Sequence, residues 1–180
     1  MSQYSNLILS LFLGSILATG CSSNAQTNEV TVDANHEGFI FRPNSYGVDT
    51  TIAYNEGIYT LQDGEEMLQY SLQRDSLQID RDYHLENDSS YNIKATVHYK
   101  ISRGQASKVH LELGRQYHTY VEDLLVEVCE LQLIDFDISV INVNTIGRLE
   151  PLIGEHMREK ALRRGLSIMF IEIQNLESLL

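Results

Sequence analysis

The sequence predicts an α+β fold: a mostly antiparallel sheet with a long hairpin at about residues 76–101, two to three packed helices and a closing strand. Three patterns support this prediction. Residues 91–101 alternate between apolar and polar side chains, the two-residue period of a strand with one buried face. Residues 117–131 repeat apolar side chains at helical spacing. Residues 166–173 (LSIMFIEI) form an almost continuous apolar run, which is typical of a buried strand.

The overall charge excludes some classes of function. The chain has 180 residues, with 25 acidic and 13 basic side chains and a formal charge of −12. This length suits one domain with a leader and is enough to bury a hydrophobic core. The negative charge argues against nucleic-acid binding and against electrostatic docking on anionic lipid, since both need a basic surface. The two cysteines, Cys21 and Cys129, are too few for a disulfide scaffold and lack metal-type spacing.

The first 20 residues have the pattern of a lipoprotein signal peptide. Residues 7–18 are an apolar run too short to cross a membrane as a helix but suited to a signal sequence. The LATGC motif that follows resembles a bacterial lipobox, which implies cleavage before Cys21 and lipidation of its thiol. Residues 21–35 are then expected to be a flexible tether. The residues before the apolar run contain no Lys or Arg, which departs from the usual pattern.

Two other interpretations of the leader stay open: an ordinary cleaved signal, or an uncleaved anchor in which Cys21 is incidental. The lipobox interpretation places the protein in the bacterial cell envelope, lipid-anchored on the periplasmic face of a membrane. Ser22 follows the cysteine where some lipoproteins carry the Asp that retains them at the inner membrane. This favours the outer membrane and leaves the choice between the two open.

Short strands are predicted before the hairpin. Residues 39–41 form a candidate strand that stops at Pro43, because proline has no backbone N–H to continue a ladder. Residues 50–54 are rich in β-branched side chains and predict another strand. Further extended segments are expected at residues 58–61 and 67–72, separated by the turn residues Asp63 and Gly64.

The hairpin is the most regular part of the sequence. Leu77, Ile79, Tyr83 and Leu85 lie on one side of its first strand, and residues 86–90 are turn formers. In the second strand the odd positions predict the buried face and the even positions the solvent face. The odd positions are Tyr91, Ile93, Ala95, Val97, Tyr99 and Ile101.

Two helices are predicted directly after the hairpin. Ser102 and Gln105 have the spacing of a capping box, and Gly114 suits the position after the end of the first helix. The second helix is predicted to bury a single stripe, which consists of Tyr117, Val121, Leu124, Leu125, Val128 and Leu131.

The pattern after residue 132 is less regular, so the elements predicted there have less definite boundaries. Residues 133–143 suit a short strand or an extended linker, and a continued helix is the alternative. A third helix is expected to start near residue 144 or 145 and to end before Gly165, with a kink or its beginning at Pro151. Its predicted buried stripe is Ile146, Leu149, Ile153, Met157 and Ala161. Residues 166–173 are predicted to form a strand covered on both faces, central in its sheet or sandwiched.

Four motifs resemble the SPFH (Band 7, prohibitin/stomatin-like) domain. They are HEGFI at residues 36–40, NEGIY at 55–59, GRQY at 114–117 and EKALRRGL at 159–166, together with the alternating strand 91–101. The resemblance implies one domain over residues 36–180. It departs from the family in lacking a proline soon after residues 55–59 and the usual C-terminal coiled coil.

The candidate reactive residues have ordinary explanations. Cys129 lies on the apolar side of a predicted helix, which predicts a buried, inert thiol. His110 and His118 lie on either side of Gly114, without the spacing of two metal ligands on one helix face. The pairs Glu65–Glu66 and Glu155–His156 are interpreted as surface residues. The charges at residues 159–160 and 163–164 are interpreted as a solvated helix end. No catalytic, metal or cofactor site is predicted, and Cys21 is the one functional residue.

The resemblance implies a membrane-anchored, non-enzymatic scaffold or assembly protein that organises or protects membrane proteins. Its expected partners are the membrane, through lipidated Cys21, and copies of itself or other membrane proteins, with no nucleic acid. The alternative is an envelope lipoprotein that acts as a monomeric ligand- or partner-binding module. An enzyme is the third hypothesis, which no arrangement of residues in the sequence supports.

Overall fold

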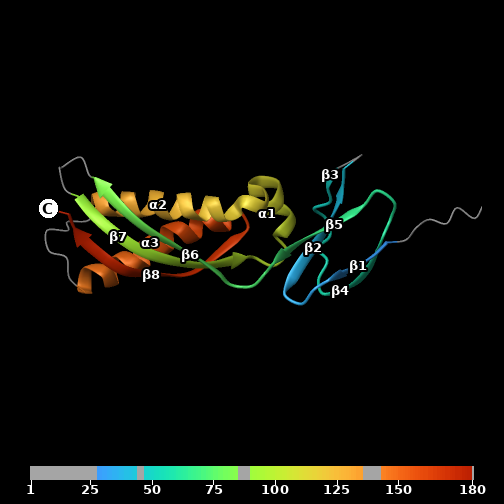
Figure 1. The fold of residues 1–180 in the computed structure, drawn as a ribbon, viewed down its shortest axis with the longest axis horizontal. Helices are drawn as coiled ribbons and strands as arrows, with labels where there is room; N and C mark the ends of the chain where they lie inside the picture. Colours follow the sequence, from blue (N-terminus) through green and yellow to red (C-terminus); the bar gives the residue numbers. More distant parts are fainter. Residues whose placement is uncertain (1–27, 44–46, 85–89, 136–142, 180) are drawn as a thin grey trace, which may run out of the picture.

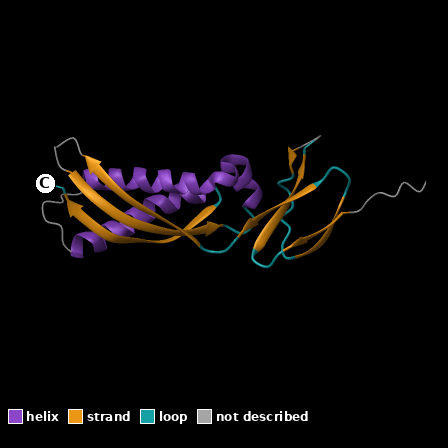
Figure 2. Ribbon diagram, in the orientation of Figure 1, coloured by secondary structure: helices purple, strands orange, loops and turns teal. Residues whose placement is uncertain are grey.

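The computed structural model describes residues 28–43, 47–84, 90–135 and 143–179. The predicted signal peptide, Cys21, Leu85 and residues 136–142 lie outside these ranges. The fold is α+β with antiparallel sheets, as predicted. It has an elongated shape, and Figures 1 and 2 show a smaller unit of strands alone at one end and a larger unit of strands and helices. We call residues 28–72 the N-terminal unit and residues 73–179 the C-terminal unit.

The N-terminal unit contains two small sheets. One pairs β1 (Asn28–Val32) with β4 (Gly57–Leu61), and the other has the order β3-β2-β5. Its strands are β3 (Gly47–Val48), β2 (His36–Arg42) and β5 (Glu66–Ser71). The predicted strands at 39–41, 58–61 and 67–72 are therefore confirmed with small shifts in their ends.

Two predictions for this unit are wrong. Residues 28–32, which were assigned to the flexible tether, form β1, and Val32 at its end is fully buried. Residues 50–54 form no strand; Tyr54 alone makes an isolated bridge to Gly38. The reason is local, because Oδ1 of Asp49 accepts hydrogen bonds from the backbone N–H of Thr51 (2.9 Å) and from its hydroxyl (2.6 Å). Such side-chain bonds favour a turn over a strand.

Gly38, on β2, lies close to a side chain from each of the two small sheets. A Cβ atom at this position would lie 2.6 Å from Sδ of Met67 and 3.1 Å from Cγ2 of Val32. A side chain at residue 38 would therefore require the Met67 side chain to move and would crowd Val32.

The larger sheet has the order β6-β7-β8. Its strands are β6 (Asp75–His84), β7 (Ser90–Ile101) and β8 (Leu166–Ser178), all antiparallel to their neighbours. The predicted hairpin is confirmed, and each odd-numbered side chain of β7 from Tyr91 to Ile101 is buried. The even face is less exposed to solvent than predicted, because Thr96 is only 8% exposed. The side-chain amide of Gln174 donates a hydrogen bond to the Thr96 hydroxyl at 2.9 Å.

The prediction that the last strand is central or sandwiched is wrong, because β8 is an edge strand. Two bulges in its pairing with β7 explain the misleading pattern, since they leave Met169 and Gln174 without a partner residue. Each extra residue shifts the alternation by one position, so that Ile168, Ile171, Ile173 and Leu176 are all buried. Because the buried side changes from even to odd positions and back again, the sequence has apolar residues at both and resembles a strand that is buried on both faces.

Side chains of the third helix cover part of the open edge of β8. The backbone N–H of Ile173 donates to Oε1 of Glu150 at 2.8 Å, and the guanidinium of Arg158 donates to the carbonyl of Met169 at 3.4 Å. Bulges and polar side chains that occupy edge groups are known ways to prevent pairing with another strand.

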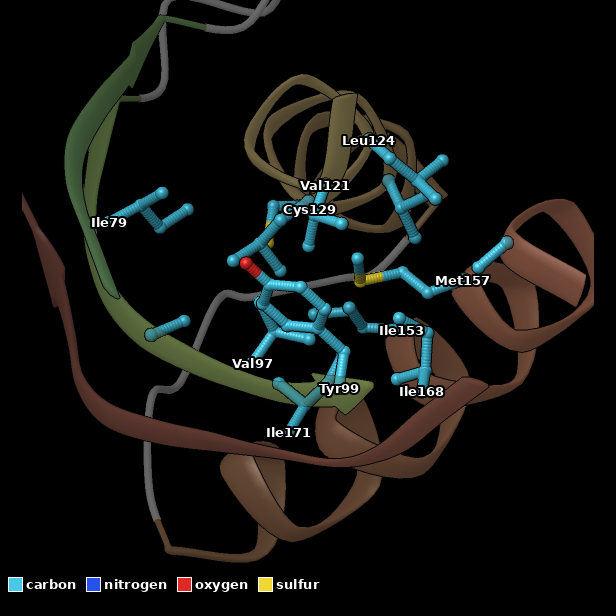
Figure 3. Close-up of a cluster of buried hydrophobic side chains, with 14 of the residues drawn as sticks. Ile79, Val97, Tyr99, Val121, Leu124, Cys129, Ile153, Met157, Ile168 and Ile171 are labelled. Atoms are coloured by element: carbon cyan, nitrogen blue, oxygen red, sulfur yellow. The ribbon is translucent and has the colours of Figure 1, made fainter. Parts of the chain in front are cut away.

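The helices are α1 (Ala106–Leu113), α2 (Tyr117–Asp135) and α3 (Val143–Leu162), with a short 3-10 turn η1 (Gly114–Gln116) between the first two. Helices α2 and α3 cover one face of the β6-β7-β8 sheet (Figures 1 and 2). Figure 3 shows the core between the sheet and these helices, to which Val97 and Tyr99 contribute from the sheet and Val121, Cys129, Ile153 and Met157 from the helices. Within the described residues, no helix combines the length and apolar content needed to cross a membrane.

The three predicted helices form, but the end of α2 and the capping box of α1 differ from the predictions, and α3 does not begin at Pro151. Helix α2 continues through Asp135, so residues 133–135 are helical instead of extended. Leu131 is 46% exposed, whereas Gln132 and Leu133 are buried. Helix α3 begins eight residues before Pro151 and continues through it. Pro151 and Gly147, whose carbonyl loses its usual partner, are both exposed, so water can bond that carbonyl.

Candidate binding site at the junction of the two units

At the junction between the two units, the start of helix α1 in the C-terminal unit is capped by a side chain of the N-terminal unit. The predicted capping box is wrong: Gln105 is the N-cap residue, and no side-chain cap bond forms there. The buried carboxylate of Glu37, on β2, accepts the backbone N–H of Ala106 through Oε1 at 2.8 Å, and that of Gly104 through Oε2. The backbone N–H of Ser102 instead donates to the carbonyl of Gly165 at 2.9 Å.

Glu37 connects the two units through hydrogen bonds. Its side chain is in the N-terminal unit, its hydrogen-bond partners are in the C-terminal unit, and the residue is 1% exposed. A buried carboxylate is costly unless it is hydrogen-bonded, and the positive end of a helix dipole adds to its stabilisation. We call this arrangement the Glu37 clasp.

An aromatic cluster lies beside the clasp. The rings of Phe39 and Tyr70 stack with centroids 5.9 Å apart, and Tyr117 at the start of α2 lies 6.0 Å from Tyr70. The hydroxyl of Tyr70 and Nδ1 of His110 are 2.9 Å apart. Burial raises the pKa of Tyr70, while burial and then Arg115 lower the pKa of His110. The pair therefore favours a neutral phenol and a neutral imidazole.

A second tyrosine–histidine pair connects β7 to α2. The hydroxyl of Tyr99 lies 2.5 Å from Nδ1 of His118, and Oδ2 of Asp75 lies 3.6 Å from the same nitrogen. Burial, followed by the charge of Asp75, raises the pKa of Tyr99. The phenol therefore stays protonated, while about half of the imidazole remains exposed.

A cavity of about 190 Å³ opens next to this second pair. It lies where the end of β5, the β5–β6 connection, the end of β7 and the start of α2 meet. Polar side chains predominate in its lining, which consists of Ser71, Gln73, Arg74, Asp75, Tyr99, Lys100, Ile101 and Tyr117. We call it the junction cavity.

Arg74 and Lys100 are the two cations in the lining of the junction cavity. Across the part of the chain that the structure describes, no carboxylate forms an ion pair with Arg74 or Lys100. The guanidinium of Arg74 lies 5.9 Å from the centre of the Phe170 ring. Asp75 is the one acid in the lining; its Oδ1 accepts the backbone N–H of Ser76 at 2.8 Å, and its Oδ2 lies 3.6 Å from Nδ1 of His118.

A second cavity, of about 270 Å³, lies between α2 and the end of α3. Its cations are paired: Lys160 with Glu127 at 2.6 Å and Arg164 with Glu112 at 3.0 Å. Lys160 and Arg164 therefore connect the end of α3 to α2 and α1, whereas Glu159 and Arg163 pair with each other at 2.6 Å and stay exposed, as the interpretation of a solvated helix end has it.

The structure places Cys129 as predicted, fully buried between α2 and the sheet (Figure 3). Burial raises the pKa of its thiol to about 12. His110 and His118 each contact a different tyrosine, and no group of three His, Cys, Asp or Glu side chains in the described ranges could hold a metal ion. Cys21 lies outside the described residues.

The two pairs interpreted as surface residues differ from each other. Glu155 and His156 are exposed. The side chain of Glu65 is only 6% exposed and pairs with Arg42 at 2.7 Å, so the surface interpretation is wrong for this residue. The backbone N–H of Gln62 and then Arg42 lower the pKa of Glu65.

Sequence reasoning missed Glu37, Arg74 and Lys100. Glu37 had a detectable signal, because it is a charged residue next to Gly38 and the apolar residues of a strand that is buried on both faces. Arg74 and Lys100 are 26 positions apart in the sequence and had no such signal, because only the hairpin fold brings them to one cavity.

The chain was also compared with known proteins. Neither the known protein families nor the curated proteins include a match to it.

Proposed function

We propose that this chain is a lipid-anchored, non-enzymatic scaffold or assembly protein of the prohibitin/stomatin-like type, which organises or protects proteins at a bacterial envelope membrane. The observation that carries the proposal is the Glu37 clasp. It couples the N-terminal unit, which begins seven residues after Cys21 in the sequence, to the C-terminal unit, which extends away from the N-terminal unit (Figure 1). A frame of this kind holds a partner-binding surface at a fixed place relative to a membrane.

The short connection to the anchor supports the proposal. Strand β1 begins at Asn28, and the six residues 22–27 separate it from Cys21. A fully extended chain spans at most about 3.5 Å per residue, so the N-terminal unit starts within about 25 Å of the lipidated cysteine.

The charge of the N-terminal unit favours attachment through lipid chains. Residues 28–72 contain eight acidic residues and one basic residue, Arg42, which makes a formal charge of −7 out of −12 for the chain. Anionic headgroups repel such a surface. Acyl chains on Cys21 would hold the protein in spite of this repulsion, because their burial in the bilayer does not depend on protein charge.

Membrane attachment is tested by replacing each cysteine in turn. Cys21→Ser should move the protein from the membrane fraction to a soluble or precursor form, because it removes the acylated thiol. Cys129→Ser, the matched control, should leave the protein in the membrane fraction. Unchanged membrane association of Cys21→Ser would refute the anchor.

Scaffolding is tested by cross-linking in intact membranes and by the native mass after gentle solubilisation. The proposal predicts assemblies larger than the 20.5 kDa chain, formed with copies of itself or with other membrane proteins. A strictly monomeric protein without cross-linked partners would refute the scaffold.

The junction cavity favours a second function, the monomeric ligand-binding module. Concave sites with a few converging polar groups are the usual form of small-molecule sites, although this cavity is small among them. A monomeric native mass together with ligand binding at the cavity would support this function over the scaffold.

A further inference from the structure

The two edges of the β6-β7-β8 sheet differ in how far they are protected. Strand β8 has two bulges in its pairing, and the side chains of Glu150 and Arg158 bond groups of its edge. Strand β6 pairs with β7 over ten consecutive residues without a bulge, and seven of its ten residues are exposed. Among the described residues, no strand pairs with its outer edge. A long, regular edge of this kind is a template for pairing with another strand.

The backbone groups on this open edge belong to the even-numbered residues of β6. The carbonyl of Ser90 on β7 accepts the N–H of Leu179 at 2.7 Å, so the even residues of β7 direct their backbone groups toward β8. The odd residues of β7 therefore bond β6, where they face odd residues, as Val97 faces Leu77. The N–H and C=O groups of the even residues in the range 76–84 point out of the sheet.

The acidic side chains of β6 do not close this edge. The amide of Asn92 on β7 donates to Oδ1 of Asp80 at 3.0 Å and to Oδ1 of Asp82 at 2.8 Å, which holds both carboxylates over the sheet. On the helix-facing side of the strand, the side chains of Arg81 and Asp75 are each about half exposed. One cation and one acid on the same side of β6 are therefore accessible to a partner.

We propose that β6 pairs antiparallel with β6 of a second copy of this chain, in a register centred on Gln78, and so joins two three-stranded sheets into one. This rests on the scaffold proposed above and names its partner and its surface. A two-fold axis perpendicular to the sheet sets odd residues opposite odd residues. Leu77 then faces the partner's Ile79, and Asp75 faces the partner's Arg81, so that apolar groups and opposite charges meet on the helix-facing side.

The even residues supply the hydrogen bonds of this pairing. Gln78 faces the partner's Gln78, and Ser76 and Asp80 face each other in both directions. These three pairs exchange roughly six backbone hydrogen bonds, two for each pair. The N–H of Ser76, which bonds Oδ1 of Asp75 at 2.8 Å, instead bonds a carbonyl of the partner, and this frees Asp75 for the partner's Arg81.

Charge selects this register over its neighbours. A register centred on Asp80 sets this carboxylate against the partner's Asp80. One centred on Arg81 sets two guanidinium groups against each other and Asp80 against the partner's Asp82. Like charges directly opposite each other destabilise a ladder. A register centred on Ile79 sets Arg81 against the partner's Leu77 and pairs no opposite charges, so it lacks the attraction of the Gln78 register.

Disulfide cross-linking tests the register in the full-length, membrane-anchored protein. In Gln78→Cys the two introduced thiols face each other across the two-fold axis, so mild oxidation should give a dimer on a non-reducing gel. The matched control is Asp80→Cys, on the same side of the same strand. Its two thiols are four residues apart along the ladder, about 13 Å, which is beyond the reach of a disulfide. The native Cys129 is buried and should not cross-link.

Charge exchange tests the pairing of Asp75 with the partner's Arg81. Arg81→Glu sets two acids against each other and should weaken self-association at least tenfold, measured by sedimentation of the full-length protein in a neutral detergent. The double variant Asp75→Arg/Arg81→Glu restores opposite charges and should return to within threefold of the wild type, which a folding defect would not allow. Arg163→Glu, an equal change of charge at an exposed position outside β6, should have less than a twofold effect.

The results separate this proposal from the scaffold on which it rests. Equal cross-linking of Gln78→Cys and Asp80→Cys, or no recovery in the double variant, would overturn the pairing of β6. Assemblies that form without a cross-link in Gln78→Cys would also overturn it and leave the scaffold in place, with another surface or another protein as its partner. A strictly monomeric protein without cross-linked partners would refute both.

Discussion

Removing the Glu37 carboxylate tests how the two units are held together. In Glu37→Ala the buried N–H of Ala106 loses its acceptor, and the N–H of Gly104 must turn to water. Hydrogen bonds to charged groups contribute about 1.5–3 kcal/mol each, and an unsatisfied buried donor costs about 1–3 kcal/mol. Because Gly104 is exposed and can be hydrated, we expect a total loss of about 2–4 kcal/mol from the free energy of unfolding.

Urea denaturation followed by far-UV circular dichroism measures this loss. A domain has about 5–15 kcal/mol of stability, so the midpoint of Glu37→Ala should fall clearly below that of the wild type. Glu37→Gln keeps one acceptor oxygen and should lie between the two. The control Glu66→Ala, at an exposed position of β5, should change the stability by less than about 0.5 kcal/mol.

Hydrogen exchange locates the effect. The backbone amides of α1 should exchange faster in Glu37→Gln, because the short helix loses part of its cap, whereas those of α2 should keep most of their protection. Equal midpoints for Glu37→Ala and Glu66→Ala, or unchanged exchange in α1, would refute the role assigned to the clasp.

Three further predictions concern the turns and the core. Gly64→Ala and Gly165→Ala both place a side chain at positive φ, which costs about 1–2 kcal/mol, but Gly165→Ala should cost at least about 1 kcal/mol more in thermal unfolding. Its Cβ would lie 3.0 Å from Cβ of Gln105, while Gly64 has open space; equal losses would contradict the tight turn. Cys129 should react with a thiol reagent at pH 8 only after unfolding, since burial raises its pKa to about 12; fast reaction of the native protein would contradict its burial. The raised pKa of Tyr99 contributes stability that is complete below the unfolded value near 10 and declines as the pH rises above it, so absorbance at 295 nm should show its ionisation coupled to alkaline unfolding. Ionisation of every tyrosine near pH 10 in a protein that stays folded would contradict this.

Strand β1 was not predicted, because its own sequence carries little of the pattern of a strand. Its sequence, NEVTV, is polar at three of its five positions and resembles the preceding tether. Its pairing with β4 lies about 30 residues further along the chain, with Val30 opposite Tyr59. A strand with one buried residue has little pattern of its own, so its partner decides whether it forms.

Helix α3 and strand β8 show a different limit of prediction from sequence. The stripe of α3 was predictable because Leu149, Ile153, Met157 and Ala161 repeat at helical spacing and are all buried. The burial pattern of β8 was not, because its two bulges depend on how β7 pairs with it. A single-strand pattern carries no information about extra residues in a ladder.

Local patterns were sufficient for the hairpin, for most of the helices and for the burial of Cys129, because the period of apolar residues reflects which face of an element meets the core. Tertiary structure alone decided the edge position of β8, the capping of α1 by Glu37 and the meeting of Arg74 with Lys100 at one cavity. These features join residues that are distant in the sequence. Their hydrogen bonds and charges depend on separations of a few ångströms, which arise only when the strands and helices pack.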